Sequence, residues 1–264
     1  MIEERPVLVA RFLGGFRVTV GDVTVGTGPR RRVRQVLAYL LAHRRAPVPR
    51  DVLADVFWPD AAPDAARNNL HVTLSYVRQA LRAAHPAASV ERRFDTYRIA
   101  GDVAVWTDVE QFARHRADGL RAERANDAVA ALRSHEAACQ LYDGDFLADD
   151  PYAAWAEPIR EALRLDVIDV QSRLIEAYLE QGAYAPATIL ARRLVEMDPC
   201  NEQAHRRLMS CYAASGQRHL ALSQYHRLCD LLWTTLRVAP SARTTELFRE
   251  LCHPRHDRLA GLAS

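Results

Sequence analysis

The chain has 264 residues, 49% hydrophobic and 26% charged, which is enough for two domains with buried cores. Its apolar runs are short and broken by charge, which excludes a membrane span, and the acidic start MIEERPVLVARF does not resemble a secretory signal. Five cysteines without a C-x-x-C pair argue against a disulfide framework or a structural zinc site, and CHPRH at 252–256 lacks a second ligand cluster. We therefore expect a cytoplasmic protein with no bound metal.

The net charge of +2 hides an asymmetry along the chain. Residues 1–100 hold 16 arginines against 9 acidic residues, whereas residues 101–264 hold 19 arginines against 24 acidic residues. A basic first part followed by an acidic second part suggests a polyanion-binding module joined to something else. Chance segregation of charge is the alternative.

The first hundred residues predict strands, three helices and a hairpin, in that order. Residues 7–25 alternate in hydrophobicity around glycine turn signals, which predicts three short antiparallel strands. Helices are predicted within 26–44, where Pro29 suits the first turn, and at about 50–57 and 63–83. Two short strands then flank RFD, and a third piece lies near Val103–Trp106. This order is that of a helix-turn-helix followed by a β-wing.

The helix predicted at 63–83 carries an apolar stripe and a polar face. At 100° per residue, Leu70, Leu74, Val77 and Leu81 share the buried side. The opposite side and one flank carry short polar and basic side chains: Arg67, Asn68, His71, Ser75, Arg78, Gln79 and Arg82. Arginine, asparagine and serine can pair with base edges in a major groove that admits a helix. The pattern fits a recognition helix; a solvated surface is the alternative.

Two further basic features accompany this helix. Arg30, Arg31, Arg32 and Arg34 stand at the start of the first predicted helix, where backbone N–H groups already favour phosphate. The segment ERRFDTYR (91–98) stands at the predicted hairpin, where a wing can lie along an adjacent groove. Contacts of this kind position a protein on DNA and do not specify sequence.

From Asp108 onward the chain keeps a helical period, with one acidic, turn-rich interruption at DGDFLADDPYAAW. Residues 176–199 can be laid over residues 210–233 with an offset of 34, the tetratricopeptide period. The offset matches four pairs, Tyr178 with Tyr212, Gly182 with Gly216, Ala187 with Ala221 and Leu194 with Leu228. An ordinary α-helical domain with a coincidental match is the alternative.

The sequence does not indicate an enzyme. It contains no G-x-S-x-G, H-E-x-x-H, G-x-G-x-x-G or G-x-x-x-x-G-K-[ST] motif. The acids of DGDFLADDP could in principle form a catalytic pair, but a solvated acidic turn is the simpler interpretation. We expect no cofactor.

Residues 7–106 resemble the OmpR-type response-regulator winged helix, and with residues 107–251 the chain resembles the Streptomyces antibiotic regulatory protein family. The resemblance is carried by RRRVRQVLAYLLAHRRAPVPRDVLADVFWPDAAPDAARNNLHVTLSYVRQAL, LYDGDFLADDPYAAW and PCNEQAHRRLMSCYAASGQRHLALSQYHRL. It implies an α+β winged helix-turn-helix domain at 1–106, followed at 107–264 by an all-α, tetratricopeptide-like bacterial transcriptional activator domain.

The resemblance also implies a function. Proteins of this family bind direct repeats in promoter DNA, with two or more protomers side by side, and activate by contacting RNA polymerase, often at antibiotic gene clusters. We therefore expect a homo-oligomer, such as a dimer, on double-stranded DNA, with RNA polymerase holoenzyme as partner and no membrane association. By resemblance, Asn68, His71, Thr73, Ser75 and Arg78 fall on the recognition helix, and Arg92, Arg93 and Thr96 fall on the wing.

Two positions depart from the family's usual pattern. Tyr76 stands where arginine is frequent, and no proline-glycine pair precedes Tyr97 in the wing. A second hypothesis is therefore a tetratricopeptide-type interaction adaptor whose winged helix binds protein. A third is a regulator that binds a small molecule in its helical part. Protection of an operator-length duplex distinguishes the first from the second.

Overall fold

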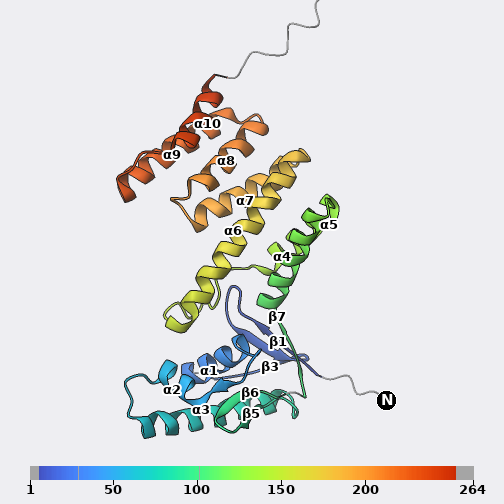
Figure 1. Ribbon diagram of the computed structural model, residues 1–264, viewed down its shortest axis with the longest axis vertical. Helices are drawn as coiled ribbons and strands as arrows, with labels where there is room; N and C mark the ends of the chain where they lie inside the picture. The colour runs from blue at the N-terminus through green and yellow to red at the C-terminus, as the bar shows by residue number, and fades with distance from the viewer. Residues whose placement is uncertain (1–5, 29, 101, 254–264) are drawn as a thin grey trace, which may run out of the picture. The chain divides into compact units, whose positions relative to one another are not determined.

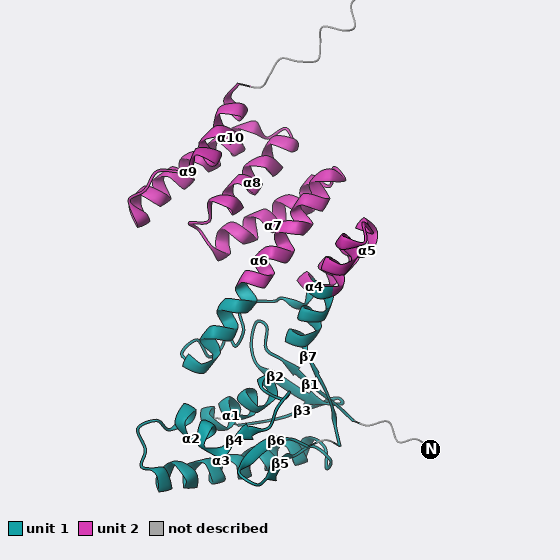
Figure 2. Cartoon of the chain, in the orientation of Figure 1, with its two compact units in different colours: residues 1–117, 140–164 teal, residues 118–139, 165–264 magenta. Residues whose placement is uncertain are grey.

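The computed structural model describes residues 6–28, 30–100 and 102–253 (Figure 1). They form two compact units (Figure 2). Unit 1 contains the residues up to Ala117 together with Gln140–Arg164, and unit 2 contains Asp118–Cys139 together with the residues from Leu165 onward. Each unit is therefore built from two stretches of sequence. The boundaries of the compact units differ from the domain ranges 1–106 and 107–264 expected from the sequence. Those domain ranges stay a prediction.

Unit 1 carries two small sheets. The first has the strand order β3-β2-β1-β7, in which β1 runs antiparallel to β2 and parallel to β7. The second has the order β4-β6-β5, with both pairs antiparallel. The strands are β1 Val7–Arg11, β2 Arg17–Val20, β3 Val23–Thr24, β4 Val48–Pro49, β5 Val90–Arg93, β6 Thr96–Ile99 and β7 Ala104–Thr107. The predicted strands and the hairpin are thus present.

Three helices complete the winged helix, namely α1 Arg31–Ala42, α2 Arg50–Phe57 and α3 Pro63–Ala84. They contact one another around a buried core to which α1 contributes Leu37 and Leu40, α2 contributes Leu53, and α3 contributes Leu70 and Leu74. Burial of this apolar surface supplies the main force that holds α3 in place. Helix α1 begins at Arg31, and Pro29, which we expected in its first turn, lies outside the described residues.

The first helix after the wing is joined to the first sheet by a buried carboxylate. Asp108 opens α4 (Asp108–Arg124), and its side chain accepts hydrogen bonds from the backbone N–H groups of Phe12, Leu13 and Val109 at 2.8–2.9 Å. Burial raises the pKa of Asp108, while these backbone donors act in the opposite direction. The carboxylate thereby satisfies N–H groups just beyond the end of β1.

The acidic interruption of the helical part belongs to unit 1. Phe146 stacks on Phe12 with ring centroids 5.0 Å apart, and Trp155, in the short 3-10 helix η1 (Ala154–Ala156), meets the Tyr39 ring of α1 edge-on at 5.0 Å. The Leu147 N–H donates to the Phe12 carbonyl at 2.9 Å. This segment is a packed part of the unit, where the sequence predicted a solvated turn.

The remaining helices are α5 Ala128–Leu141, α6 Glu157–Glu180, α7 Tyr184–Met197, α8 Glu202–Ala214, α9 Arg218–Leu236 and α10 Ala242–Cys252. Within unit 2, α7 packs on α8, α8 on α9, and α10 on both α8 and α9. This arrangement is tetratricopeptide-like, as the sequence predicted. No helix within the described ranges is long and apolar enough to cross a membrane.

The 34-residue repeat in the sequence corresponds to a repeat in the structure. Gly182 and Gly216 hold equivalent turns between paired helices with positive φ of 71° and 76°, a conformation that glycine adopts without strain. Ala187 and Ala221, one position of the repeat, are both fully buried. Because alanine is small, it leaves room for a neighbouring helix at that position.

Candidate nucleic-acid interface

Helix α3 presents a polar face to solvent because its apolar residues are buried in the core. Pro63 suits the first turn, where its missing N–H is not needed. Leu70, Leu74, Val77 and Leu81 are completely buried, so the side chains on the other faces point outward. The polar face that the sequence predicted to contact base edges is therefore open to a ligand.

The residues of α3 that the sequence predicted to contact bases differ in exposure. Arg67, Asn68, His71 and Ser75 are exposed. Thr73 is only 7% exposed and lies at the edge of the core, which argues against the predicted contact with DNA. The physical reason is the helical period, which places Thr73 about 60° from Leu70, at the edge of the buried stripe. Exposed Val72, which the sequence argument omitted, can supply an apolar contact to a thymine methyl group.

Arg78 joins the helix to the wing. Its Nε donates to the Val90 carbonyl of β5 at 2.9 Å, and the side chain is half-buried. Burial lowers the pKa of Arg78, and the charges of Arg82 and Arg92 lower it further. The charges of Arg82 on the same helix and Arg92 on the wing thus act on Arg78, and a phosphate bound beside Arg78 would be attracted by all three.

The wing is the hairpin of β5 and β6. Arg92 and Arg93 are exposed at its end, as a phosphate contact requires. Thr96 is half-buried, and its hydroxyl donates to the Arg93 carbonyl at 2.8 Å, so it supports the turn. Phe94, which the sequence argument did not select, is 94% exposed at the tip.

The arginines at the start of α1 have different surroundings. Arg30 stacks over the Tyr76 ring of α3 with its Cζ 3.9 Å from the ring centroid, which brings a positive charge to the position where the family often has arginine. Arg32 donates to Gln35, and burial together with the charge of Arg31 lowers its pKa. Arg30 thus lies against α3, whereas Arg32 lies over the Phe57 and Trp58 rings at 5.7 and 5.6 Å. Both stay predicted phosphate contacts.

Arg31 and Arg34 pair with the acidic segment of unit 1. Arg31 contacts Asp150 at 2.5 Å, and Arg34 pairs with Asp149 and donates to the Phe16 carbonyl at 2.8 Å. Burial opposes ionisation of Asp150, but hydrogen bonds from Gln35 and Arg31 outweigh it and lower the pKa of that carboxyl. Phosphate contacts by these two arginines therefore compete with two carboxylates, which the sequence argument did not anticipate.

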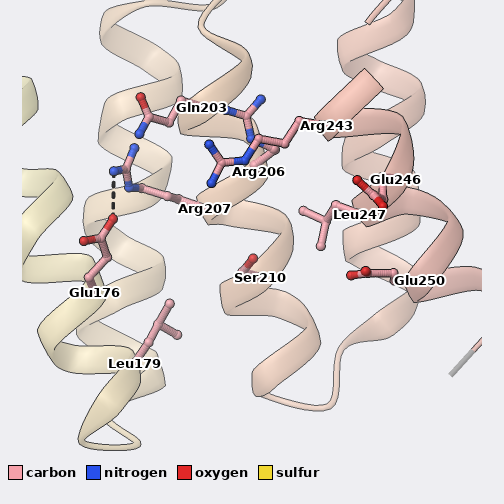
Figure 3. A pocket seen from close by; sticks show the side chains of 10 residues that line it. All are labelled: Glu176, Leu179, Gln203, Arg206, Arg207, Ser210, Arg243, Glu246, Leu247 and Glu250. Carbon is pink, nitrogen blue, oxygen red and sulfur yellow. Dashed lines mark hydrogen bonds and ion pairs between the residues drawn. The ribbon is translucent and has the colours of Figure 1, made fainter. Parts of the chain in front are cut away.

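Unit 2 contains a groove of about 400 Å³ between α6, α8 and α10 (Figure 3). Arg206 and Arg243 approach each other at one end, while Glu246 and Glu250 lie along α10. Arg207 pairs with Glu176 of α6 at 2.9 Å. The groove thus carries arginines on α8 and α10 and carboxylates on α6 and α10, and it suits a ligand that carries both charges.

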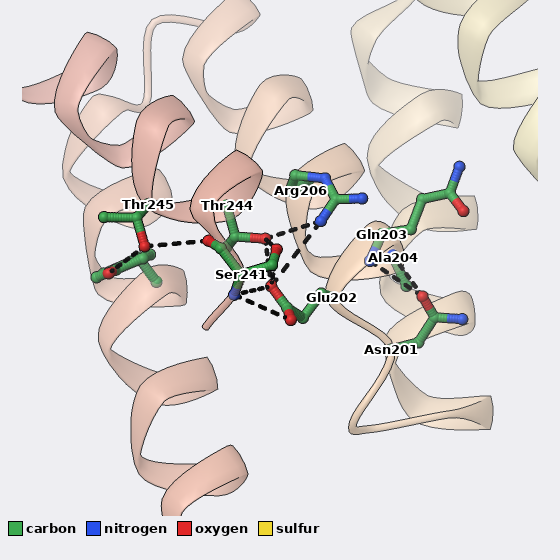
Figure 4. A network of polar contacts seen from close by, with 9 residues as sticks. Asn201, Glu202, Gln203, Ala204, Arg206, Ser241, Thr244 and Thr245 are labelled. Carbon is green, nitrogen blue, oxygen red and sulfur yellow. Dashed lines mark hydrogen bonds and ion pairs between the residues drawn. The ribbon is translucent and has the colours of Figure 1, made fainter. Parts of the chain in front are cut away.

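One wall of this groove is fixed by a polar network (Figure 4). Glu202 accepts hydrogen bonds from the Ser241 N–H and hydroxyl and from the Thr244 hydroxyl, and Arg206 donates to Thr244 at 2.8 Å. Burial opposes ionisation of Glu202, but these donors outweigh it and lower its pKa. The network ties the start of α10 to the start of α8, which Asn201 caps through its side-chain oxygen.

The structure offers no metal centre within the described ranges. No three histidine, cysteine, aspartate or glutamate side chains gather there as metal ligands would. Of the CHPRH residues, Cys252 and His253 are described and His256 lies outside the described residues.

Comparison with known proteins identifies the family. Residues 107–252 match the bacterial transcriptional activator domain. The transcriptional regulatory protein MoaR1 of Mycobacterium tuberculosis is 28% identical over 224 residues, covering 83% of this chain and 71% of MoaR1. The regulatory protein DnrI of Streptomyces peucetius is 31% identical over 228 residues, covering 82% of each chain.

A solved structure shares the fold. Mycobacterium tuberculosis EmbR, in complex with a low affinity phosphopeptide, superposes with a TM-score of 0.77 at 24% identity over 94% of this chain. The chain spans 65% of the length of that EmbR structure. An α+β winged helix followed by tetratricopeptide-like helices is thus common to both. The chain belongs to the Streptomyces antibiotic regulatory protein family, with a bacterial transcriptional activator domain over residues 107–252.

Proposed function

We propose that this protein activates transcription by binding direct repeats in promoter DNA, with α3 in the major groove and the wing beside it. The observation that carries the proposal is that α3 exposes Asn68 and His71 and is joined to the wing by the hydrogen bond from Arg78 Nε to the Val90 carbonyl at 2.9 Å, with Arg92 exposed on the wing. The arginines supply the electrostatic attraction to phosphate, and the short polar side chains supply base contacts.

The second part of the proposal concerns protein partners. Two protomers occupy adjacent repeats, and unit 2 contacts RNA polymerase, at a secondary-metabolite gene cluster. The groove lined by Arg206, Arg243, Glu246 and Glu250 supports a polymerase contact because its mixed charges fit a peptide segment of mixed charge. The relatives MoaR1 and DnrI, a transcriptional regulatory protein and a regulatory protein, support a role in regulating transcription.

Footprinting on duplexes from the promoter regions nearest the gene tests DNA binding directly. We expect two protected repeats and an affinity that falls steeply as salt rises, because phosphate contacts release counterions. Asn68→Ala should lose about tenfold or more in specific affinity while binding to unrelated DNA stays unchanged. Arg249→Ala, an exposed arginine of unit 2, is the matched control.

The outcomes separate the proposal from its rival. An unprotected promoter contradicts DNA binding and favours the interaction adaptor. An affinity independent of salt contradicts the proposed phosphate contacts. Equal loss of specific and non-specific affinity in Asn68→Ala contradicts the assignment of α3 as the reading helix.

A further inference from the structure

Phe94 occupies the turn between β5 and β6 in a conformation that costs free energy. Its φ is +51°, in the left-handed region that bulky residues rarely adopt and that glycine or asparagine adopts readily. Its side chain is also the most exposed of the large hydrophobic side chains among the described residues, at 94%. Strain of this kind persists where the surroundings impose it, and it is concentrated at functional sites.

The turn that carries Phe94 is firmly held. The Arg50 N–H donates to the Asp95 carbonyl at 2.7 Å, and the Arg50 guanidinium pairs with the Asp95 carboxylate at 3.0 Å. The Arg92 Nε donates to the Phe94 carbonyl at 2.9 Å. The backbone on both sides of the ring is thus fixed by α2 and by β5. The ring itself points into solvent from a rigid support.

The surroundings of the ring favour one class of ligand. Exposed Arg92 and Arg93 precede it in the same hairpin, and Arg78 and Arg82 of α3 add positive potential near Arg92. Asp95 follows the ring, and its carboxylate pairs with Arg50 and Arg92, so the tip carries one negative charge against the three positive charges of Arg50, Arg92 and Arg93. A ring in such net positive surroundings suits an anionic groove better than an apolar protein surface. In DNA the minor groove attracts arginine through its negative potential, and apolar side chains enter it as wedges between base steps.

We propose that Phe94 inserts into the minor groove of the bound duplex, next to the segment that α3 reads, and partly unstacks one base step. This inference rests on the proposed function, since it requires that α3 binds DNA. It gives the wing a part in specificity, because flexible pyrimidine–purine steps are unstacked at lower cost than stiff A-tracts. The left-handed turn is what directs the ring away from the hairpin and toward the duplex.

Phe94→Gly is the decisive variant, because glycine removes the ring and relieves the positive φ, so the fold should be at least as stable. We would place 2-aminopurine at successive positions of the protected promoter duplex and measure its fluorescence and the affinity. Wild-type protein should raise the fluorescence at one step beside each repeat. Phe94→Gly should abolish that rise and lose about tenfold in affinity, while Phe94→Leu should retain part of both.

Trp233→Ala, which removes an exposed aromatic ring from unit 2, should behave as wild type. If wild-type protein protects no duplex, the proposed function fails and this inference fails with it. If wild-type protein protects its repeats but Phe94→Gly gives the same affinity and the same fluorescence, only the Phe94 inference is overturned. A Phe94→Gly variant that binds DNA normally but activates transcription poorly would assign the ring to a protein contact and would also overturn it.

Discussion

The Arg31 guanidinium contacts the Asp150 carboxylate at 2.5 Å across 119 residues of sequence. Arg31 is 64% exposed, whereas Asp150 is only 7% exposed and also accepts a hydrogen bond from Gln35 at 2.6 Å. The carboxylate is thus fixed, and the arginine is the partner that can leave. Because Arg31 is also a predicted phosphate contact, Asp150 and DNA compete for one guanidinium group.

Asp150→Asn should therefore strengthen DNA binding. Without the negative charge, Arg31 is free to pair with phosphate, and an ion pair whose arginine is exposed is worth about 0.2–1 kcal/mol, or roughly up to fivefold in affinity. The titration should be made at several salt concentrations, because one added phosphate contact steepens the salt dependence by about one unit of slope. Glu196→Gln, which removes an exposed negative charge from α7, is the control for net charge. Equal gains in both variants would mean that net charge alone is responsible.

Phe146→Ala should destabilise unit 1 even though Phe146 is far in sequence from the winged helix. The ring is 1% exposed and stacks on Phe12, so its removal leaves a cavity and should cost about 3–5 kcal/mol of the free energy of unfolding. Tyr152→Ala, six residues further on, removes an aromatic side chain that is 88% exposed and should cost little. Thermal unfolding of the two variants checks this, and similar losses would refute the packing of residues 140–164 into unit 1.

The contrast between α3 and the 140–164 segment shows what the sequence can predict. The reading face of α3 follows from the period of Leu70, Leu74 and Val77, which is written within one helix. The same period places Thr73 at the buried edge, so that expectation came from the family resemblance and not from the helix itself. Phe12, on which Phe146 stacks, and Arg31 and Gln35, which bind Asp150, lie more than 100 residues away, and no local pattern marks them.

The wing illustrates a second limit of prediction from the sequence. The strand signals around RFD predicted the hairpin, but not which of its side chains would be free. The exposure of Phe94 depends on a two-residue turn held by Arg50 of α2, a contact between elements separated by α3. Turn geometry of this kind is decided by tertiary contacts, which the local sequence does not contain.

Gly119→Ala should destabilise unit 2, although alanine favours helices over glycine by about 1 kcal/mol. A Cβ at position 119 of α4 would lie 2.4 Å from Cε1 of His135, and that ring is buried and tied to Glu123 at 2.9 Å. Overpacking should outweigh the gain in propensity and give a net loss of about 1–3 kcal/mol. Gly26→Ala, where a Cβ meets nothing within 4 Å, is the matched control. A Gly119→Ala protein that melts at or above the wild-type temperature would contradict this packing.

His205 should make the stability of unit 2 depend on pH. The ring is 1% exposed; Nε2 donates to the Pro199 carbonyl at 3.0 Å, and Nδ1 accepts from the Gln224 amide at 2.8 Å, an arrangement that requires a neutral imidazole. Burial, together with the charge of Arg227, lowers the pKa of His205 in the folded state. Below the ordinary value of 6.5 the unfolded chain binds the proton more readily than the folded one, so stability is complete above pH 6.5 and falls as the pH drops below it.

The corresponding measurement is the free energy of unfolding between pH 7.5 and 5.0 for three proteins. Wild type should lose up to about 1.4 kcal/mol per pH unit more than His205→Gln, because a glutamine at this position cannot take up the proton. His219→Gln changes an exposed histidine of the neighbouring helix α9 and should keep the wild-type slope. Comparing the slopes of unfolding free energy against pH removes any pH-independent loss of stability that the substitution itself causes. Parallel curves for wild type and His205→Gln would show that the buried imidazole is not the group that titrates.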